Sequence, residues 1–221
     1  MAAEARVRVW DGPVRIVHWL IALAVPALWW TGEHDQLDWH RRIGYGVLGL
    51  LLFRLIWGFV GGSTARFAGF IRGPRTVAGY ASRLFRGEKA AVVGHNPMGG
   101  WSVAALLALV LAEVGLGLFA VDVDGLEPGP LSRFVDFDAG RAAAQWHAWV
   151  FYAFLAMIGL HLAAIVFYAA VKRDNLVGPM LTGRRTAVEG AAPMAAAPLW
   201  RALVAAAVAT ALAVWIARGL R

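Results

Sequence analysis

Two histidines fourteen residues apart in one long apolar segment constrain this chain more than any other feature. His147 and His161 both lie in the segment AAAQWHAWVFYAFLAMIGLHLAAIV. Fourteen residues is close to four helical turns, so a helix places both rings on one face, ~21 Å apart along its axis. Polar side chains inside a bilayer are expensive and usually functional. The spacing therefore predicts two separate imidazole sites on one membrane-spanning helix.

The composition agrees with a membrane protein. Of the 221 residues, 60% are hydrophobic and only 16% are charged, which leaves too little polar surface for a soluble globule. Five segments approach or exceed the ~20 residues that a bilayer requires. We expect an all-α fold with helices at residues 14–31, 43–61, 101–121, 144–171 and 199–217.

The connections between these segments alternate in charge. Six basic residues and one acid lie between residues 62 and 100, whereas five acids lie between residues 122 and 138. Basic loops stay on the cytoplasmic side of a membrane, so the pattern predicts a cytoplasmic N-terminus and a C-terminus outside. The net charge of +7 follows from this topology and does not indicate nucleic-acid binding, because no basic stripe with interleaved aromatic residues occurs.

The predicted topology sorts the histidines by depth. His18 lies near the start of the first, outward-running segment, on the inner side, and His40 starts the second segment, on the outer side. The fourth segment runs inward, so His147 is outer and His161 lies four turns deeper. The pairs that match in depth are His18 with His161 and His40 with His147. Two such bis-histidine sites are the arrangement needed to hold two haems across a membrane.

The absence of cysteine limits the chemistry further. It excludes disulfides, cysteine-ligated iron–sulfur clusters, thiolate zinc sites and covalent haem attachment. Any haem must therefore be a non-covalent b haem held by His or Met. A single zinc or copper site is disfavoured, because the four rings cannot converge when two of them are ~21 Å apart on one helix. We interpret His34 as a solvated loop residue and His95 as structural rather than a ligand.

Other residues leave alternatives open. Gly44, Gly117 and other glycines near the histidines provide room for a macrocycle or for ordinary helix packing. Glu113, an acid well inside the third segment, is expected to relay protons or to hydrogen-bond a haem neighbour. Arg54 fits propionate contact and simple snorkelling equally well.

Several stretches resemble the bacterial cytochrome b561 family of di-haem membrane cytochromes, which includes the cytochrome b subunits of hydrogenases and formate dehydrogenases. They are WDGPVRIVHW, WHRRIGYGVLGLLLFRLIWGFVG, GHNPMGG, WHAWVFYAFLAMIGLHLAA and NLVGPMLTGRR, and they cover about residues 8 to 185. The resemblance implies a transmembrane four-helix bundle holding two haem b, with iron ligands His18, His40, His147 and His161. Residues 1–185 would form this domain, 186–198 a linker, and 199–221 a fifth transmembrane helix beyond the usual four-helix core.

The expected function is electron transfer in a bacterial inner membrane. Two axial imidazoles saturate the iron, which suits electron transfer rather than oxygen chemistry. Electrons would pass between a periplasmic c-type cytochrome, dehydrogenase or hydrogenase subunit and the quinone pool, so we expect an electron-transfer subunit rather than a stand-alone enzyme. The acidic outer loops are expected to dock a basic partner or simply to be solvated.

Arginines and a loop histidine complete the expected sites. Arg15, Arg41 and Arg42 are candidates for the haem propionates, because each lies close in sequence to a ligand histidine. We expect quinone at the inner haem, near Arg15 and His95. One alternative function is a quinone-linked superoxide oxidase, which would need a positive outer funnel where these loops are acidic. Another is a transporter with histidine proton relays, which would show no haem absorbance.

Overall fold

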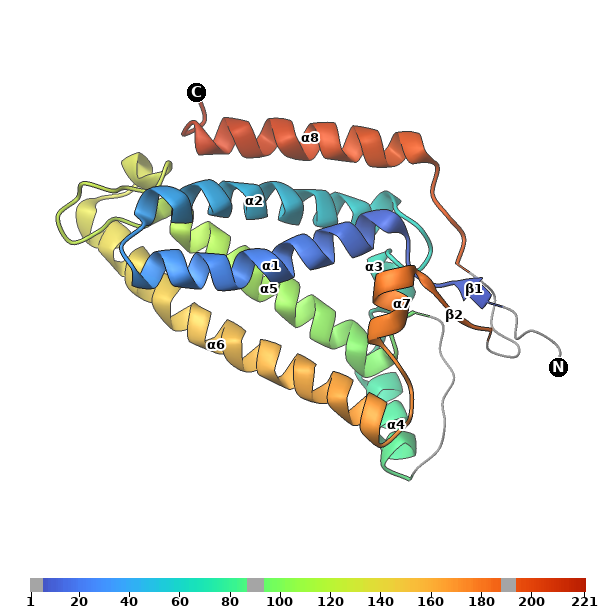
Figure 1. Cartoon of the computed structure of the whole chain (residues 1–221). Coiled ribbons are helices and arrows are strands. Elements are labelled where there is room, and N and C mark those ends of the chain that lie inside the picture. The colour runs from blue at the N-terminus through green and yellow to red at the C-terminus, as the bar shows by residue number, and fades with distance from the viewer. Residues whose placement is uncertain (1–5, 87–93, 188–193) are drawn as a thin grey trace.

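Five long helices running alongside one another dominate the structure, a computed structural model that describes residues 6–86, 94–187 and 194–221 (Figure 1). Lys89 and part of the predicted linker at 186–198 lie outside the described residues. The long helices are α1 (Gly12–Glu33), α2 (Leu37–Val60), α5 (Pro97–Phe119), α6 (Phe137–Ala170) and α8 (Leu199–Ala217). Each is long and apolar enough to cross a membrane. The predicted all-α membrane fold is confirmed.

Short elements gather at the two ends of this bundle. They are β1 (Arg6–Arg8), α3 (Phe67–Phe70), α4 (Pro74–Phe85), η1 (Ser132–Phe134), α7 (Val177–Thr182) and β2 (Arg184–Thr186). The strands β1 and β2 pair antiparallel, with Arg6 opposite Thr186. We call the end that holds this pair the clasp end. The opposite end, where the α1–α2 and α5–α6 connections lie, is the loop end (Figure 1).

Polar side chains cap the starts of three of the five long helices, α1, α5 and α6. The side chain of Asp11 accepts a hydrogen bond from the Val14 backbone N–H at 2.9 Å at the start of α1. Asn96 and Asp136 cap α5 and α6 in the same way. These two helices therefore begin four and seven residues earlier than the predicted segments at 101 and 144, because a prediction from apolar length omits the polar first turns.

The helices pack as two pairs plus the fifth helix. α5 lies along α6, and α2 lies between α1 and α8. One buried cluster joins α2, α5 and α6 through Leu51, Val110 and Phe154. Large apolar side chains such as Leu23 and Leu160 are more than 60% exposed on the outer surface. Such a surface suits lipid, and the chain is a multi-pass membrane protein.

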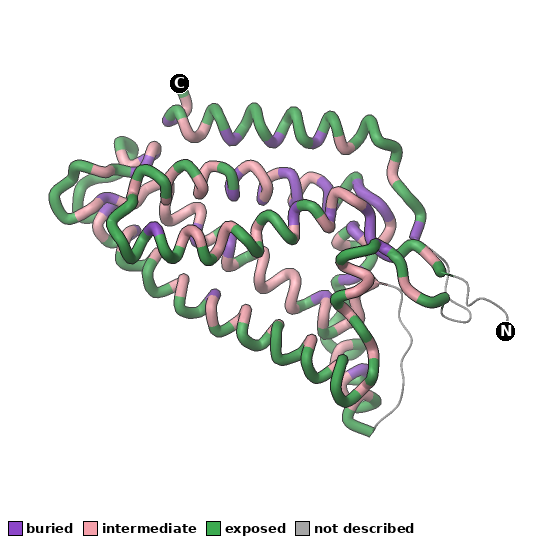
Figure 2. Tube along the Cα trace, viewed as in Figure 1, coloured by how far each residue is buried: buried purple, intermediate pink, exposed green. Residues whose placement is uncertain are grey.

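The fifth helix contacts α2 through a stripe of small residues. Ala205, Ala209 and Ala213 are buried and recur every four residues, so they share one face of α8 (Figure 2). Small residues let two helices approach closely in a membrane. At the end of α8, Arg133 donates a hydrogen bond to the Gly219 carbonyl. The last residues therefore lie at the loop end, opposite the clasp, as five successive crossings require.

Candidate functional site

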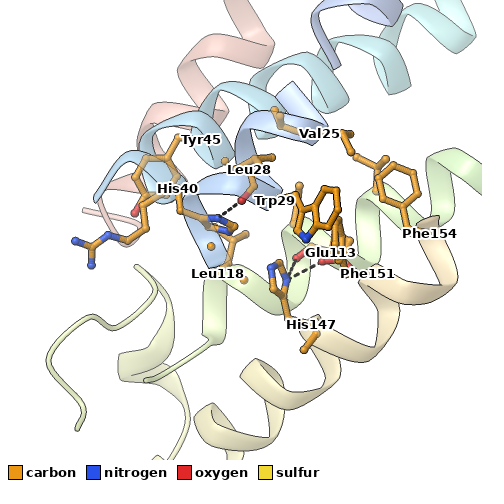
Figure 3. Close-up of a pocket in the computed structure, with 18 of the residues that line it drawn as sticks. Val25, Leu28, Trp29, His40, Tyr45, Glu113, Leu118, His147, Phe151 and Phe154 are labelled. Carbon is orange, nitrogen blue, oxygen red and sulfur yellow. Dashed lines mark hydrogen bonds and ion pairs between the residues drawn. The ribbon is translucent and has the colours of Figure 1, made fainter. Parts of the chain in front are cut away.

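Two of the four predicted histidines face one another at the loop end. His40 projects from α2 and His147 from α6 (Figure 3), with ring centroids 6.0 Å apart and planes at 76°. An imidazole nitrogen binds a metal ion at about 2.0–2.1 Å. Two rings this close could both reach one metal-containing group placed between them.

Backbone carbonyls set the tautomer of both rings. His40 Nδ1 lies 3.0 Å from the Leu28 carbonyl oxygen, and His147 Nδ1 lies 2.9 Å from the Glu113 carbonyl oxygen. A carbonyl oxygen only accepts, so each Nδ1 carries the proton and donates it. The Nε2 lone pair of each ring is then free for a metal. Metal-ligating histidines are usually oriented by such a bond from the other ring nitrogen.

A cavity with a mostly apolar lining surrounds this pair. Its side chains come from α1, α2, α5 and α6, and three glycines, Gly32, Gly44 and Gly117, form part of the wall. A Cβ atom added at Gly44 would meet nothing within 4 Å, whereas one at Gly117 would lie 3.3 Å from His147 Cε1. The glycines leave open space in front of the rings. An apolar wall with two convergent imidazoles suits a flat, mainly apolar cofactor.

Glu113 is the one acid of α5, and it contacts His147. Its carboxylate Oε2 lies 2.9 Å from His147 Nδ1, so the proton on that nitrogen is shared between the carboxylate and the Glu113 carbonyl oxygen. The residue is 9% exposed, and its other carboxylate oxygen has no hydrogen-bond partner among the described residues. Of the two predicted roles, the structure places Glu113 as the hydrogen-bonding neighbour of a proposed haem ligand.

The arginines predicted near the outer pair differ in their surroundings. Arg41 lines the cavity, forms an ion pair with Asp38 at 2.8 Å and another with Glu127. The second pair connects α2 to the loop between α5 and α6. Arg42 is exposed, and its guanidinium lies over the Trp39 ring at 5.4 Å. Of these two arginines, only Arg41 lines the cavity, and its carboxylate partners already compensate its charge.

Arg15 holds the clasp end together. Its side chain donates hydrogen bonds to the carbonyl oxygens of Met180, at 3.2 Å from Nε, and of Leu181. These carbonyls belong to α7, which lies 165 residues further along the chain, so nothing in the sequence around Arg15 indicates the contact. The predicted propionate role of Arg15 therefore has to coexist with this packing role.

The second predicted pair lies towards the clasp end. His18 of α1 and His161 of α6 are close enough for direct electrostatic interaction, and both also interact with His95. His18 Nδ1 is buried and has no hydrogen-bond partner in the described part of the chain. Burying a polar atom without a partner is unfavourable. A polar or metal-containing ligand beside His18 would relieve this, so the residues fit a cofactor here too.

Two further orphaned polar atoms belong to the same group of side chains. They are Nη1 of Arg54 and Nδ1 of His95, both buried. The His95 ring lies 4.5 Å from the Trp10 ring and 4.8 Å from the Phe70 ring. Burial, with a smaller effect of the nearby Arg54 cation, lowers the pKa of His95 to about 3, so this ring is neutral. His95 was expected near the inner haem, and it interacts electrostatically with His18 and His161.

His34 belongs to neither histidine pair, and the protein side chains alone do not form a metal site in the described part of the chain. His34 is exposed at the end of α1 and stacks on Trp30, in keeping with its predicted place in a loop. The described residues contain no cluster of three or more His, Cys, Asp or Glu side chains that could hold a metal ion. A metal at either histidine pair would therefore have to bring its other ligands with it, as the iron of haem does.

Comparison with known protein families gives one match. The family model described as prokaryotic cytochrome b561 matches residues 9–183, from the residue after β1 to the residue before β2. Neither the curated proteins nor the solved structures gave a significant match. The matched region contains both histidine pairs and leaves α8 outside.

Proposed function

The chain belongs to the prokaryotic cytochrome b561 family, and from that premise we propose that it holds two b haems and connects a periplasmic redox partner to the quinone pool. Membership makes it a membrane b-type cytochrome of electron transfer. The number of haems, the partner and the quinone link are our proposal. The observation that carries it is the 6.0 Å separation of the His40 and His147 rings, with both Nδ1 atoms bonded to backbone carbonyls.

The proposed ligands follow the pairs that depth predicts. His40 and His147 would hold the outer haem, and His18 and His161 the inner one. Bound there, haem b supplies reversible one-electron transfer. The protein orients the outer imidazoles through Leu28 and Glu113 and lines the cavity mainly with apolar side chains.

Arg54 is our proposed anion-binding residue of the inner site. It is 5% exposed, which argues against snorkelling towards water, and its Nη1 atom lacks a partner. Its charge acts on His95, which in turn interacts with His18 and His161. A carboxylate such as a haem propionate would satisfy this guanidinium.

The charge of the connections supports the proposed orientation. The clasp end carries the basic connections and would face the cytoplasm of a bacterial inner membrane, whereas the loop end would face the periplasm. At the loop end, Asp124 and Asp138 are exposed, while Glu127 and Asp136 are engaged with Arg41 and with the start of α6. The exposed acids are available to dock a basic redox partner.

The domain division expected from the sequence stays part of the proposal. Residues 1–185 would form the di-haem domain, and residues 199–221 an additional membrane helix. The proposed ligands all lie before α7, and α8 contacts the rest of the bundle mainly through α2. The fifth helix is then an attachment to the di-haem domain rather than a part of its cofactor sites.

The decisive experiment counts haems in the purified protein. We expect two b haems per chain by the pyridine haemochrome assay. His147→Ala and His40→Ala should each remove the same component of the reduced-minus-oxidised spectrum, and His18→Ala and His161→Ala should remove the other. One haem per chain, or a component shared by His147→Ala and His18→Ala, would contradict the proposed pairs.

Quinone is proposed at the inner haem, beside His95. The ring of His95 belongs to the same electrostatic group as His18 and His161, and it precedes the polar start of α5. His95→Ala should slow oxidation of the reduced cytochrome by a soluble quinone while both haem spectra remain. If quinone oxidises the reduced His95→Ala cytochrome at the normal rate and the reduced His34→Ala cytochrome slowly, the quinone site belongs at the outer face instead.

The other functions predict different results. A superoxide oxidase needs cations around the outer site, yet the cavity arginine, Arg41, is paired with two carboxylates. A histidine-based transporter would purify without haem absorbance, so the same spectrum tests it.

A further inference from the structure

We propose that Glu113 is a positioning residue that lowers the midpoint potential of the outer haem by accepting a hydrogen bond from its ligand His147. The inference rests on the proposed function, because it needs a haem between His40 and His147. It concerns a property that the ligand pairs alone do not give, namely a difference in electron affinity between the two sites.

The geometry joins the carboxylate directly to the ligand ring. Glu113 Oε2 and the Glu113 carbonyl oxygen each lie 2.9 Å from His147 Nδ1 (Figure 3). One residue thus provides two acceptors for a single N–H, and the backbone contact fixes which nitrogen carries the proton. A carboxylate in this place strengthens the electron donation of the other nitrogen to a metal. Stronger donation favours ferric over ferrous iron, so the midpoint potential falls.

His40, the proposed ligand on the other side, has only neutral acceptors. Its Nδ1 contacts the Leu28 carbonyl oxygen at 3.0 Å and the Thr31 hydroxyl at 3.4 Å. That hydroxyl lies 2.8 Å from the Ala27 carbonyl oxygen, to which it donates. The two ligands of the outer site are therefore unequal, and the difference resides in Glu113.

The surroundings of Glu113 explain why the contact should have a large effect. The side chain is 9% exposed in the middle of an apolar helix, and its Oε1 atom has no partner in the described ranges. Low local polarity around a buried side chain strengthens its hydrogen bonds. An acid inside a membrane helix is unfavourable unless it serves a function. Strengthening the electron donation of His147 is such a function.

The test is a redox titration of the purified full-length protein, followed by optical spectroscopy. Glu113→Gln should keep two haems and raise the midpoint potential of the component that His147→Ala removes. Mutating the partner that orients a metal-ligating histidine typically costs about tenfold or more in metal affinity or activity, and we expect a tenfold effect on the redox equilibrium here. A tenfold change in the one-electron equilibrium constant is 59 mV. The midpoint potential of the inner component should not change.

Two controls separate the hydrogen bond from other effects. Glu127→Gln removes a nearby acid that pairs with Arg41 and does not contact a ligand, so it reports the effect of losing a negative charge without a hydrogen bond to His147. Thr31→Val removes the weak hydroxyl contact of His40 and should leave the potential near that of wild type. The electron paramagnetic resonance signal of the outer ferric haem should change in Glu113→Gln and not in Glu127→Gln, because it reports the strength of the axial ligands.

The outcomes distinguish this inference from the proposed function. A wild-type protein without haem overturns the proposed function itself. If Glu113→Gln holds two haems, and the midpoint potential and electron paramagnetic resonance signal of its outer haem are those of wild type, only the role of Glu113 is overturned. If Glu113→Gln fails to assemble, Glu113→Asp decides. Its carboxylate is one methylene shorter, so we expect an outer potential above that of wild type, and an unchanged value would refute the proposal.

Discussion

A leucine placed at Gly44 should empty the outer site without disturbing the fold. Gly44 lies one helical turn after His40, lines the cavity, and has no atom within 4 Å of its Cβ position. A leucine there extends into the space in front of the rings and meets no protein atom near its base. Helix propensity favours leucine over glycine by somewhat less than 1 kcal/mol, so the helix itself should not weaken.

The size of the effect follows from overpacking. Adding methylenes to a site that is already filled costs about 1–3 kcal/mol. If the cofactor has to share the cavity with the leucine, its affinity should fall about 5- to 150-fold, since each 1.4 kcal/mol is a factor of ten. We therefore expect purified Gly44→Leu to lose most of the outer haem, with the haem ratio moving from two towards one, while Gly44→Ala keeps both.

Gly46 provides the matched control. It also has open space around its Cβ position, but it lines the groove between α2 and α8 instead of the histidine cavity. Gly46→Leu should retain two haems. The assay is the pyridine haemochrome ratio together with the spectral component assigned by His147→Ala. Full haem content in Gly44→Leu, or loss of that same component in Gly46→Leu, would show that the cavity is not the cofactor site.

Three further predictions concern the rest of the molecule. Asp11→Ala removes both the cap on Val14 and the 2.9 Å hydrogen bond from Trp57 Nε1. Losing the two hydrogen bonds should destabilise the protein by about 2–3 kcal/mol. In thermal denaturation the Tm of Asp11→Ala should be lower than that of Asp11→Asn, and equal Tm values would contradict this. Reporter fusions should place the loop from Arg66 to Lys89 in the cytoplasm and Arg221 in the periplasm, and a cytoplasmic Arg221 would mean that α8 does not span. The pKa of His95 is about 3 in the folded protein and about 6.5 in the unfolded chain. The unfolded chain therefore binds more protons below pH 6.5, and the stability that this group contributes is full above pH 6.5 and is lost as the pH falls towards 3. The Tm of wild type should consequently fall more between pH 7 and 5 than the Tm of His95→Gln.

The sequence was sufficient for the long helices and for the closeness of His40 and His147, because both depend on local or one-dimensional properties. Apolar length predicts a span, and His147 and His161 indeed lie on one helix, α6. Alternating loop charge gave each histidine a depth, and the structure brings His40 to His147. Depth alone does not give the rotation of a helix about its axis, so it could not show that Glu113 faces His147 or that Arg54 is buried.

Contacts between distant segments were not predictable. Arg15 donates to carbonyls of α7, and the ring of His95, which was expected near the inner haem, packs against Trp10 and Phe70. Neither contact has a periodic signal in the sequence, because each depends on how distant segments come together at the clasp end. The strands β1 and β2 are three residues each, too short for alternation to reveal them.

The pairing of β1 with β2 also dictates an order of assembly. Arg6 pairs with Thr186, so 180 residues separate the partners. At about 5–20 residues per second of synthesis, the first strand waits roughly 10–40 s for the second, while four helices are inserted. The strand β1 is thus unpaired throughout translation of the core and can pair only after these four helices have been synthesised. A ribosome-stalled chain ending before residue 184 should expose β1 to protease, whereas the completed chain should protect it.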